Sequence, residues 1–273
     1  MSKRTPAFQD RASDRLKAPT PPRRDRALEQ AIAAGRIAIH FQPQIEPGTG
    51  RVAGVEALAR WQGADGARQL FERAARAGLT ERLSRFAQRE ALRIAGDWTG
   101  PLTELRISIN LLAEDLARED YDRWLLAEIA AAGLSPDRVT AEITECSLLA
   151  DQDTAAERLG RLRDAGVQVA VDDFGTGYAS LSYLTSLPLD ALKIDQGLVA
   201  DLAHGQRGRI VVRAMIGLAH ELGLKVIAEG VETAAQLALL SGWGCDLYQG
   251  FLGAGALDEA DLADFVATRT LAA

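Results

Sequence analysis

Polar side chains stand at the ends of several apolar segments, where a purely structural strand would carry Val, Ile or Leu. Five carboxylates, one amide and one amine share this position: Glu56, Asn110, Glu142, Asp172, Asp173, Lys193 and Glu229. A single residue of this kind could be a helix cap or an exposed Glu at a sheet edge. Buried charges are unfavourable unless they are paired or bound to metal, so their recurrence at successive strand ends favours one shared site.

The donor types of this set point to a hard divalent cation. Carboxylate and amide oxygens without His or thiolate suit Mg²⁺ or Mn²⁺ better than a structural Zn²⁺. Adjacent residues of a regular strand point to opposite faces, so Asp172 and Asp173 can reach one site only where the pleat ends. Phe174-Gly175-Thr176-Gly177 is expected to supply that end, and a shared carboxylate could bridge two metals.

Lys193 has two interpretations at this stage. It could simply balance the charge of the carboxylates around it. Alternatively, a lysine beside a two-metal site can orient the attacking water or stabilise negative charge that builds on a phosphate.

Apolar segments of strand length alternate with longer amphipathic stretches, the pattern of repeated βα units. About eight units can be counted. The expected strands are Ile37 to Pro43, Val52 to Arg60, Leu105 to Asn110, Val139 to Thr144, Val167 to Val171, Ala191 to Ile194, Lys225 to Ala228 and Cys245 to Tyr248. This rhythm is typical of a barrel or a doubly wound sheet, and 273 residues suffice for one barrel of roughly 250.

Helical patterns lie between these strands, and several end at a glycine. They are Leu79 to Asp97, Asp122 to Ala132, Asp153 to Asp164, Arg207 to Leu222 and Ala234 to Ser241. Gly133, Gly166, Gly223 and Gly242 follow such runs, where a left-handed residue is needed to leave a helix. We place a flexible, basic and Pro-rich segment at residues 1–26 and one domain at 27–273.

Composition narrows the class of protein further. A net charge of −7 argues against a general DNA or RNA binder, and no apolar stretch reaches the length of a membrane span. The N-terminus lacks the apolar run of a signal peptide, so a cytoplasmic protein is expected. Cys146 and Cys245 are expected to be buried free thiols.

The ordered series of motifs resembles the EAL family of bacterial phosphodiesterases specific for cyclic di-GMP. The matching segments, spread over about residues 27–257, are Glu56 to Trp61, Ile109-Asn110, Glu142 to Glu145, Asp172 to Tyr178, Lys193 to Asp195, Ala228 to Thr233 and Gln249 to Phe251. The resemblance implies a (β/α)8 TIM-type barrel, in the EAL variant with a small lobe over the C-terminal rim. It also implies hydrolysis of cyclic di-GMP to linear pGpG, which lowers the level of this second messenger.

The resemblance also implies residue roles. Glu56, Asn110, Glu142 and Asp172 would hold one Mg²⁺ or Mn²⁺, while Asp172, Asp173 and Glu229 hold or surround a second. Lys193 would position the nucleophilic water, and Glu229 could assist as a general base.

Further positions match substrate contacts and a regulatory loop of the family. Gln42, Leu58, Arg60, Asp195 and Gln249 would contact the substrate, with Arg60 suited to a phosphate. Glu145 would anchor the loop that includes Phe174, Gly175, Thr176 and Gly177, through which family members couple dimerisation to metal binding. A homodimer is therefore expected.

Two departures from the family pattern keep an alternative open. The stretch Gln62 to Ala77 is shorter than in the family by roughly half a dozen residues, and the Pro that often follows Gln249-Gly250-Phe251 is absent. A weak or inactive domain that acts as a cyclic di-GMP receptor or protein-interaction module is thus the second interpretation. The chain shows no cyclase motif or sensory domain, so any regulatory protein partner is unidentified.

Overall fold

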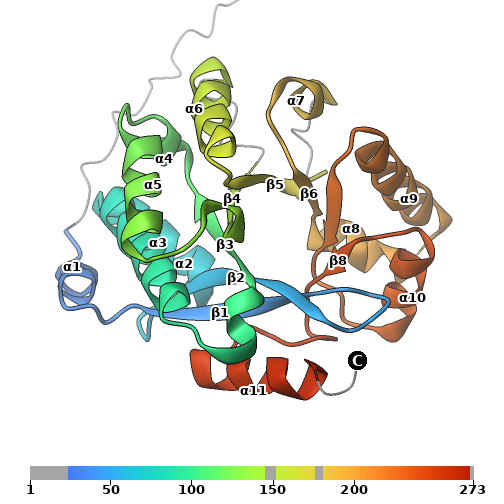
Figure 1. Ribbon diagram of the computed structural model, residues 1–273, viewed down its shortest axis with the longest axis horizontal. Coiled ribbons are helices and arrows are strands. Elements are labelled where there is room, and N and C mark those ends of the chain that lie inside the picture. The colour runs from blue at the N-terminus through green and yellow to red at the C-terminus, as the bar shows by residue number, and fades with distance from the viewer. Residues whose placement is uncertain (1–23, 145–151, 176–180, 204, 271–273) are drawn as a thin grey trace, which may run out of the picture.

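The computed structural model describes residues 24–144, 152–175, 181–203 and 205–270, which fold around a closed barrel of eight strands in sequence order (Figure 1). The strands are β1 (Ala38–Ile45), β2 (Val52–Arg60), β3 (Arg106–Leu111), β4 (Val139–Thr144), β5 (Gln168–Phe174), β6 (Ala191–Ile194), β7 (Lys225–Ala228) and β8 (Leu247–Tyr248). The expected α/β barrel is therefore confirmed.

Helices surround the barrel (Figure 1). The α-helices are α1 (Arg26–Ala33), α2 (Gly66–Ala77), α3 (Thr80–Gly96), α4 (Ala113–Leu116), α5 (Tyr121–Ala131), α6 (Gln152–Asp164), α7 (Leu181–Ser186), α8 (Gln196–Ala200), α9 (Gln206–Glu221), α10 (Ala234–Gly242) and α11 (Glu259–Thr270). Short 3-10 helices are η1 (Gly100–Glu104), η2 (Pro136–Arg138) and η4 (Asp201–Ala203).

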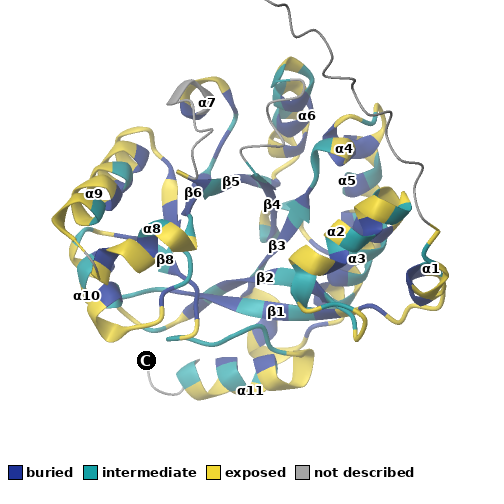
Figure 2. Cartoon of the chain, turned by 180° about the vertical axis from the view of Figure 1, so that it is seen from behind, coloured by how far each residue is buried: buried dark blue, intermediate teal, exposed yellow. Residues whose placement is uncertain are grey.

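Side chains alternate along the strands between the barrel interior and the helices. In β3, Ile107 and Ile109 are buried among the apolar core, whereas Ser108 and Asn110 contact polar residues of neighbouring strands. Figure 2 shows the same division, with buried strands inside and exposed outer faces on the helices. Because successive residues point to opposite faces, this pattern places polar groups inside the barrel.

The first strand departs from the expected series of βα units. β1 pairs antiparallel with both β2 and β8, while the remaining neighbours pair parallel. Residues 46–51 turn the chain directly from β1 into β2, with Gly50 at a φ of 73°. The first unit is thus a hairpin, because a short turn joins antiparallel strands whereas a parallel pair needs a crossover. Ala38 lies opposite Arg60, so β1 begins at the end of the barrel where β2 finishes.

The predicted bounds agree with the structure for β2, β4, β6 and β7, and differ by one to three residues for the other strands. Gly133, Gly166 and Gly223 have the expected positive φ after helices, at 70°, 105° and 75°. The prediction for Gly242 was wrong, because α10 continues through it and Gly244, with a φ of 87°, takes the left-handed position.

The described part of the chain begins just before the first helix. Asp25 caps α1 by accepting a hydrogen bond from the backbone amide of Leu28, so the helix starts slightly ahead of the boundary placed at residue 27. Residues 1–23 lie outside the described residues, as does Cys146, whereas Cys245 is a buried free thiol as expected. Within the described ranges, no helix is both long and apolar enough to cross a membrane.

Candidate active site

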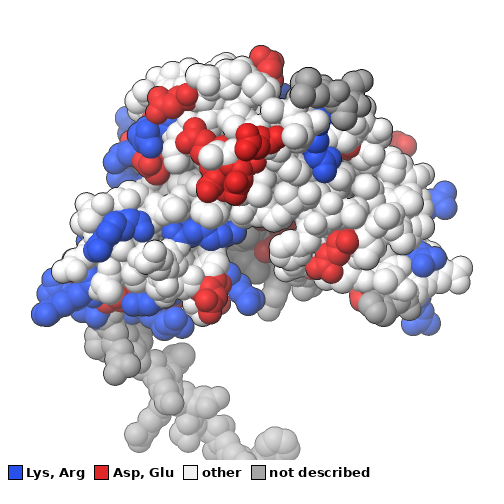
Figure 3. Space-filling model, turned by 90° about the horizontal axis from the view of Figure 1, so that it is seen from below, with Lys and Arg blue, Asp and Glu red and all other residues white. Residues whose placement is uncertain are grey.

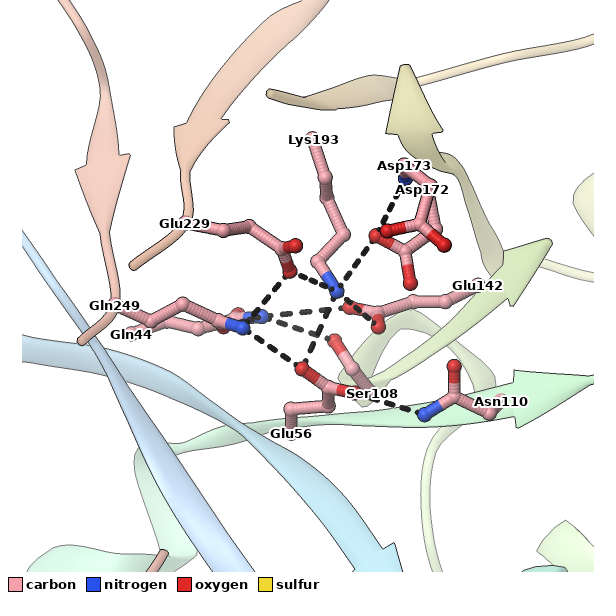
Figure 4. Close-up of polar contacts among 10 residues, drawn as sticks. All are labelled: Gln44, Glu56, Ser108, Asn110, Glu142, Asp172, Asp173, Lys193, Glu229 and Gln249. Atoms are coloured by element: carbon pink, nitrogen blue, oxygen red, sulfur yellow. Dashed lines mark hydrogen bonds and ion pairs between the residues drawn. The ribbon is translucent and has the colours of Figure 1, made fainter. Parts of the chain in front are cut away.

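The predicted carboxylates meet inside one end of the barrel. Oxygen atoms of Glu56, Glu142 and Asp172 lie within 4.8 Å of one another, and so do oxygen atoms of Asp172, Asp173 and Glu229. The side chains come from β2, β4, β5 and the residue that follows β7, and they converge in Figure 4. Asp172 belongs to both groups, which is the arrangement expected of a carboxylate that bridges two ions.

Lys193 extends from β6 into the middle of this carboxylate cluster. Its Nζ lies 2.7 Å from both Glu142 and Glu229, and 3.2 Å from both Glu56 and Asp172 (Figure 4). Its side chain is fully buried. Burial alone would lower the pKa of Lys193, but the surrounding carboxylates outweigh burial and hold this pKa well above its usual range. The ammonium is therefore charged and supplies donors on every side of the cluster.

A bulge, and not the end of the strand, lets Asp172 and Asp173 face the same site. β5 continues through Phe174, which pairs with Ile194, and its register with β6 shifts between Val171 and Phe174. Asp173 has a φ of 55°, in the left-handed region, which non-glycine residues seldom adopt. The sequence analysis expected Phe174 to Gly177 to end the strand, whereas β5 includes Phe174 and the irregularity at Asp173 re-aims the second carboxylate.

Amide side chains fix the orientation of several carboxylates. Gln249 donates from Nε2 to Glu56 at 2.8 Å and to Glu229 at 2.9 Å. Asn110 donates from Nδ2 to the other oxygen of Glu56 at 2.8 Å, which leaves its own amide oxygen turned away from Glu56 (Figure 4). Asn110 can therefore support Glu56 and still offer an oxygen to a cation.

Two buried residues beneath the cluster were not predicted. Gln44, from β1, contacts Glu142 at 3.4 Å, Gln249 at 3.4 Å and the hydroxyl of Ser108 at 3.5 Å (Figure 4). Gln44 lies two positions from the predicted substrate residue Gln42 on β1, and Ser108 lies two positions from the predicted metal ligand Asn110 on β3. The two-residue period of a strand was the signal that could have found them.

Burial and mutual repulsion shift the acidity of the carboxylates. Burial, helped by neighbouring carboxylates and opposed by Lys193, raises the pKa of Glu142 and of Glu229 to about 8. For Glu56, burial is outweighed by Lys193, Asn110 and Gln249, which lower its pKa. Burial and the nearby Asp172 raise the pKa of Asp173. The cluster thus contains more carboxyl groups than Lys193 can neutralise, so some of them bind a proton when no other cation is present.

The same residues suit a hard divalent cation. Within the described ranges, Lys193 is the only cation in an ion pair with the cluster; it pairs with four of the carboxylates, and Asp173 adds a fifth. Excess buried negative charge with all-oxygen donors is the environment that Mg²⁺ and Mn²⁺ favour. The structure thus brings together the predicted ligands, while their metal occupancy stays a prediction.

The predicted substrate residues lie around the cluster, and their contacts to a substrate stay predictions. Leu58 shares a pocket with Glu56, Asn110 and Asp172. Gln42 donates to the backbone oxygen of Ala254 at 3.4 Å. Arg60 donates to the backbone oxygen of Ala59, and Asp195 caps α8 by accepting from the amide of Gly197.

Only part of the predicted regulatory loop can be placed. Phe174 is buried at the end of β5, and Gly175 follows with a φ of 103°. Glu145, Thr176 and Gly177 lie outside the described residues.

The shortened segment after Trp61 forms helix α2. Residues of α2, including Phe71, line the same pocket as Leu58 and the carboxylates. The segment therefore forms part of the wall of the candidate site beside Glu56.

Comparison with known proteins identifies the family to which the chain belongs. A family model described as EAL domain matches residues 25–256. The chain is 37% identical over 249 residues to the Pseudomonas aeruginosa protein named cyclic di-GMP phosphodiesterase NbdA, covering 88% of this chain and 31% of NbdA. It spans about a third of the length of the first curated relatives that it matches.

Solved structures agree with this result. The Pseudomonas aeruginosa PaMucR phosphodiesterase in complex with c-di-GMP has a TM-score of 0.78 at 34% identity, covering 86% of this chain and 97% of that one. Klebsiella pneumoniae BlrP1, solved with manganese and c-di-GMP, has a TM-score of 0.74 at 34% identity, covering 81% of this chain and 56% of that one. With the match of the family model over residues 25–256, these similarities show that the chain belongs to the EAL domain family.

Proposed function

We propose that this chain hydrolyses one phosphodiester of cyclic di-GMP to linear pGpG, and so lowers the level of the second messenger. The observation that carries the proposal is the pair of carboxylate groups that share Asp172 around the buried Lys193. Its relative NbdA is named as a phosphodiesterase of this nucleotide, and PaMucR and BlrP1 were solved with it.

Two divalent ions, Mg²⁺ or Mn²⁺, are part of the proposal. Glu56, Asn110, Glu142 and Asp172 would hold the first, and Asp172, Asp173 and Glu229 the second. When bound, such ions polarise phosphate oxygens and acidify water. The proposal of two bound ions is supported by the excess of carboxylate groups over lysine in the described cluster.

The residues of the chain then orient the reactants. Lys193 directs its ammonium protons at the attacking water and at charge that develops on the phosphate. Glu229, next to the proposed second ion, is placed to accept a proton from that water. The water oxygen forms a bond to phosphorus in line with the 3′ oxygen, whose bond to phosphorus breaks, and a proton ends on that 3′ oxygen.

Outside the reacting centre, other side chains bind the nucleotide. Gln249 keeps Glu56 and Glu229 in place while it faces the substrate. Arg60 pairs with a phosphate, and Gln42, Leu58 and Asp195 contact the rest of the molecule.

The test is product analysis by chromatography after incubation with cyclic di-GMP and Mn²⁺ or Mg²⁺. The variants Glu56→Gln and Lys193→Met should each lose roughly 10³-fold or more in rate, since both remove groups that act on the reacting centre. Glu90→Gln, at a helix surface, is the matched control. Metal-dependent binding of cyclic di-GMP without any product would instead identify a receptor.

Self-association belongs to the same proposal. Helix α9 exposes Ile210 and Val211, which are 60% and 46% accessible, and such apolar side chains are available for a second copy. Light scattering of the purified chain should give the mass of a dimer, and a monomer at all concentrations would contradict this part.

A further inference from the structure

A hollow lies at the end of the barrel opposite the candidate active site. Its lining includes the first residue of each of four strands: Arg106 of β3, Gln168 of β5, Ala191 of β6 and Lys225 of β7. These strands run parallel, so their first residues meet at one end of the barrel. This hollow, named here the floor hollow, has a volume of about 580 Å³, which is in the range of small-molecule sites.

Polar side chains line the floor hollow inside the barrel. The interior of such a barrel is usually filled by branched apolar residues. Here Ser108, Thr140 and Gln168 take part in the lining, alongside the apolar Ile227 and Leu247. The interior therefore offers hydroxyl and amide groups to an occupant, where a packed apolar layer would offer none.

Arg106 brings an unpaired cation to this polar lining. Its Nη1 atom is buried and has no hydrogen-bond partner among the described residues. A buried donor without an acceptor is unfavourable, so such groups in folded proteins are nearly always satisfied by a protein group, a ligand or ordered water. An oxyanion is the acceptor best suited to a guanidinium, because the planar group donates in pairs.

Two of the acidic side chains in the lining already have partners. Glu46 pairs with Arg51, and Thr49 also donates to it. The carboxylate of Asp246 lies 2.9 Å from Nε2 of His220 and accepts a hydrogen bond from the backbone amide of Val226. Neither carboxylate is therefore available to neutralise Arg106.

The unpaired charge of the lining is positive on balance. Arg106 and Lys225 outnumber Glu104, and these three form no ion pair with any residue in the described part of the chain. Acidic side chains of the outer surface gather in a patch over α11, whose first turn carries Glu259 and Asp261 (Figure 3). Neither of them lines the floor hollow, so in a chain of net charge −7 this is a place where an anion meets an unpaired cation.

The floor hollow touches the support of the carboxylate cluster without including the cluster. Gln44 and Ser108 line it, and Nε2 of Gln44 lies 3.4 Å from Glu142. Arg106 stands two residues before Ser108, so both point into the barrel. Arg106 is also four residues before Asn110, which is about 13 Å along the strand. An occupant paired with Arg106 therefore lies beneath the candidate active site and outside it.

We propose that the floor hollow binds a small molecule carrying a phosphate or carboxylate group, whose oxyanion pairs with Arg106. The hydroxyls of Ser108 and Thr140 and the amide of Gln168 donate to its remaining oxygens. This site goes beyond the proposed function, because it lies at the other end of the barrel and takes a ligand that is not the substrate. Phosphates and carboxylates share the chemistry that a guanidinium recognises, and the experiment separates them.

The test is calorimetry with inorganic phosphate and, separately, with succinate at constant ionic strength. The protein is first treated with chelator and dialysed into metal-free buffer, so that the carboxylate cluster repels anions and does not bind them. The wild type should bind at least one of the two anions, and the one that binds more tightly identifies the group that the ligand carries.

The variants are Arg106→Gln, Arg106→Lys and the control Arg26→Gln, which removes the same charge from the exposed start of α1, outside the floor hollow. Arg106→Gln should raise the Kd about tenfold, as expected for one lost charge-assisted hydrogen bond. Arg106→Lys should recover part of the loss, and Arg26→Gln should match the wild type. If Arg106→Gln does not fold, Thr140→Val, which has a similar shape and lacks the hydroxyl, should raise the Kd roughly threefold.

Three results would overturn the proposal. If the wild type binds neither anion, water alone satisfies the buried guanidinium. If Arg106→Gln, or Thr140→Val in its place, has the Kd of the wild type, the anion binds outside the floor hollow. Equal losses in Arg106→Gln and Arg26→Gln would reflect only the overall field of the protein. None of these results depends on hydrolysis of cyclic di-GMP, because neither nucleotide nor metal is present in the assay.

Discussion

Replacing Lys193 by methionine removes the central charge of the carboxylate cluster while keeping a side chain of similar length. In the wild type the ammonium is fully buried and lies within 3.2 Å of carboxylate oxygens from Glu56, Glu142, Asp172 and Glu229. We expect Lys193→Met to unfold more easily without metal, because the buried carboxylates lose their counter-charge.

The size of this effect follows from two opposing terms. Removing one partner of a buried ion pair destabilises by about 3–5 kcal/mol. Glu142 and Glu229 already have pKa values of about 8, so they take up protons readily and limit the loss. A loss of about 3 kcal/mol is therefore expected, which corresponds to a decrease in Tm of roughly 6–12 °C.

The assay is thermal unfolding at pH 7 with chelator and again with Mn²⁺. Lys225→Met is the matched control, since Lys225 is exposed at the start of β7 and should change the free energy of unfolding by less than about 0.5 kcal/mol. Mn²⁺ should raise the Tm of Lys193→Met more than that of the wild type, because the ion replaces the missing charge. If Lys193→Met without metal melts at the wild-type temperature, Lys193 does not balance this cluster and the reasoning fails.

Three further predictions concern other groups. Gln44→Met should weaken Mn²⁺ binding about tenfold in calorimetry, because Gln44 supports Glu142 and Gln249 from below; an unchanged Kd would refute this role. The raised pKa of Glu142 means that a proton competes with the metal below about pH 8, so Mn²⁺ affinity should rise from pH 6 to 8 with proton release, and a pH-independent affinity would contradict it. Burial raises the pKa of Cys245 to about 12, so its peptide should stay unmodified by iodoacetamide at pH 8 until urea unfolds the chain; rapid labelling of the native protein would show that the thiol is accessible.

Features with a local cause were predictable from the sequence. The conformations of β4 and of the turn residue Gly133 depend on residues nearby in the sequence, and both agree with the prediction. The carboxylates were also found, because charged residues at apolar strand ends have few structural explanations.

Features that depend on how the barrel closes were not predicted. Gln44 and Gln249 are 205 residues apart, and they meet because β1 pairs with β8. The left-handed conformation of Asp173 accompanies the register shift against β6, and although Asp adopts this conformation more often than most residues, its type alone does not identify the position. The direction of β1 could have been inferred from the short turn at 46–51, which leaves no room for a crossover helix.

The reversed direction of β1 determines at which end of the barrel the chain first reaches the sheet. In a barrel of parallel strands, the chain arrives at the face opposite the catalytic rim. Here the start of β1 lies beside the end of β2, and residues of α1 line a hollow that also contains Arg60. Through Asp25 and α1, the chain therefore reaches the barrel at the same end at which β2 finishes. The ion pair of Asp25 with Arg73 joins α1 to α2, and residues of α2 line the pocket beside Glu56, so the entry helix is linked directly to the wall of the candidate site.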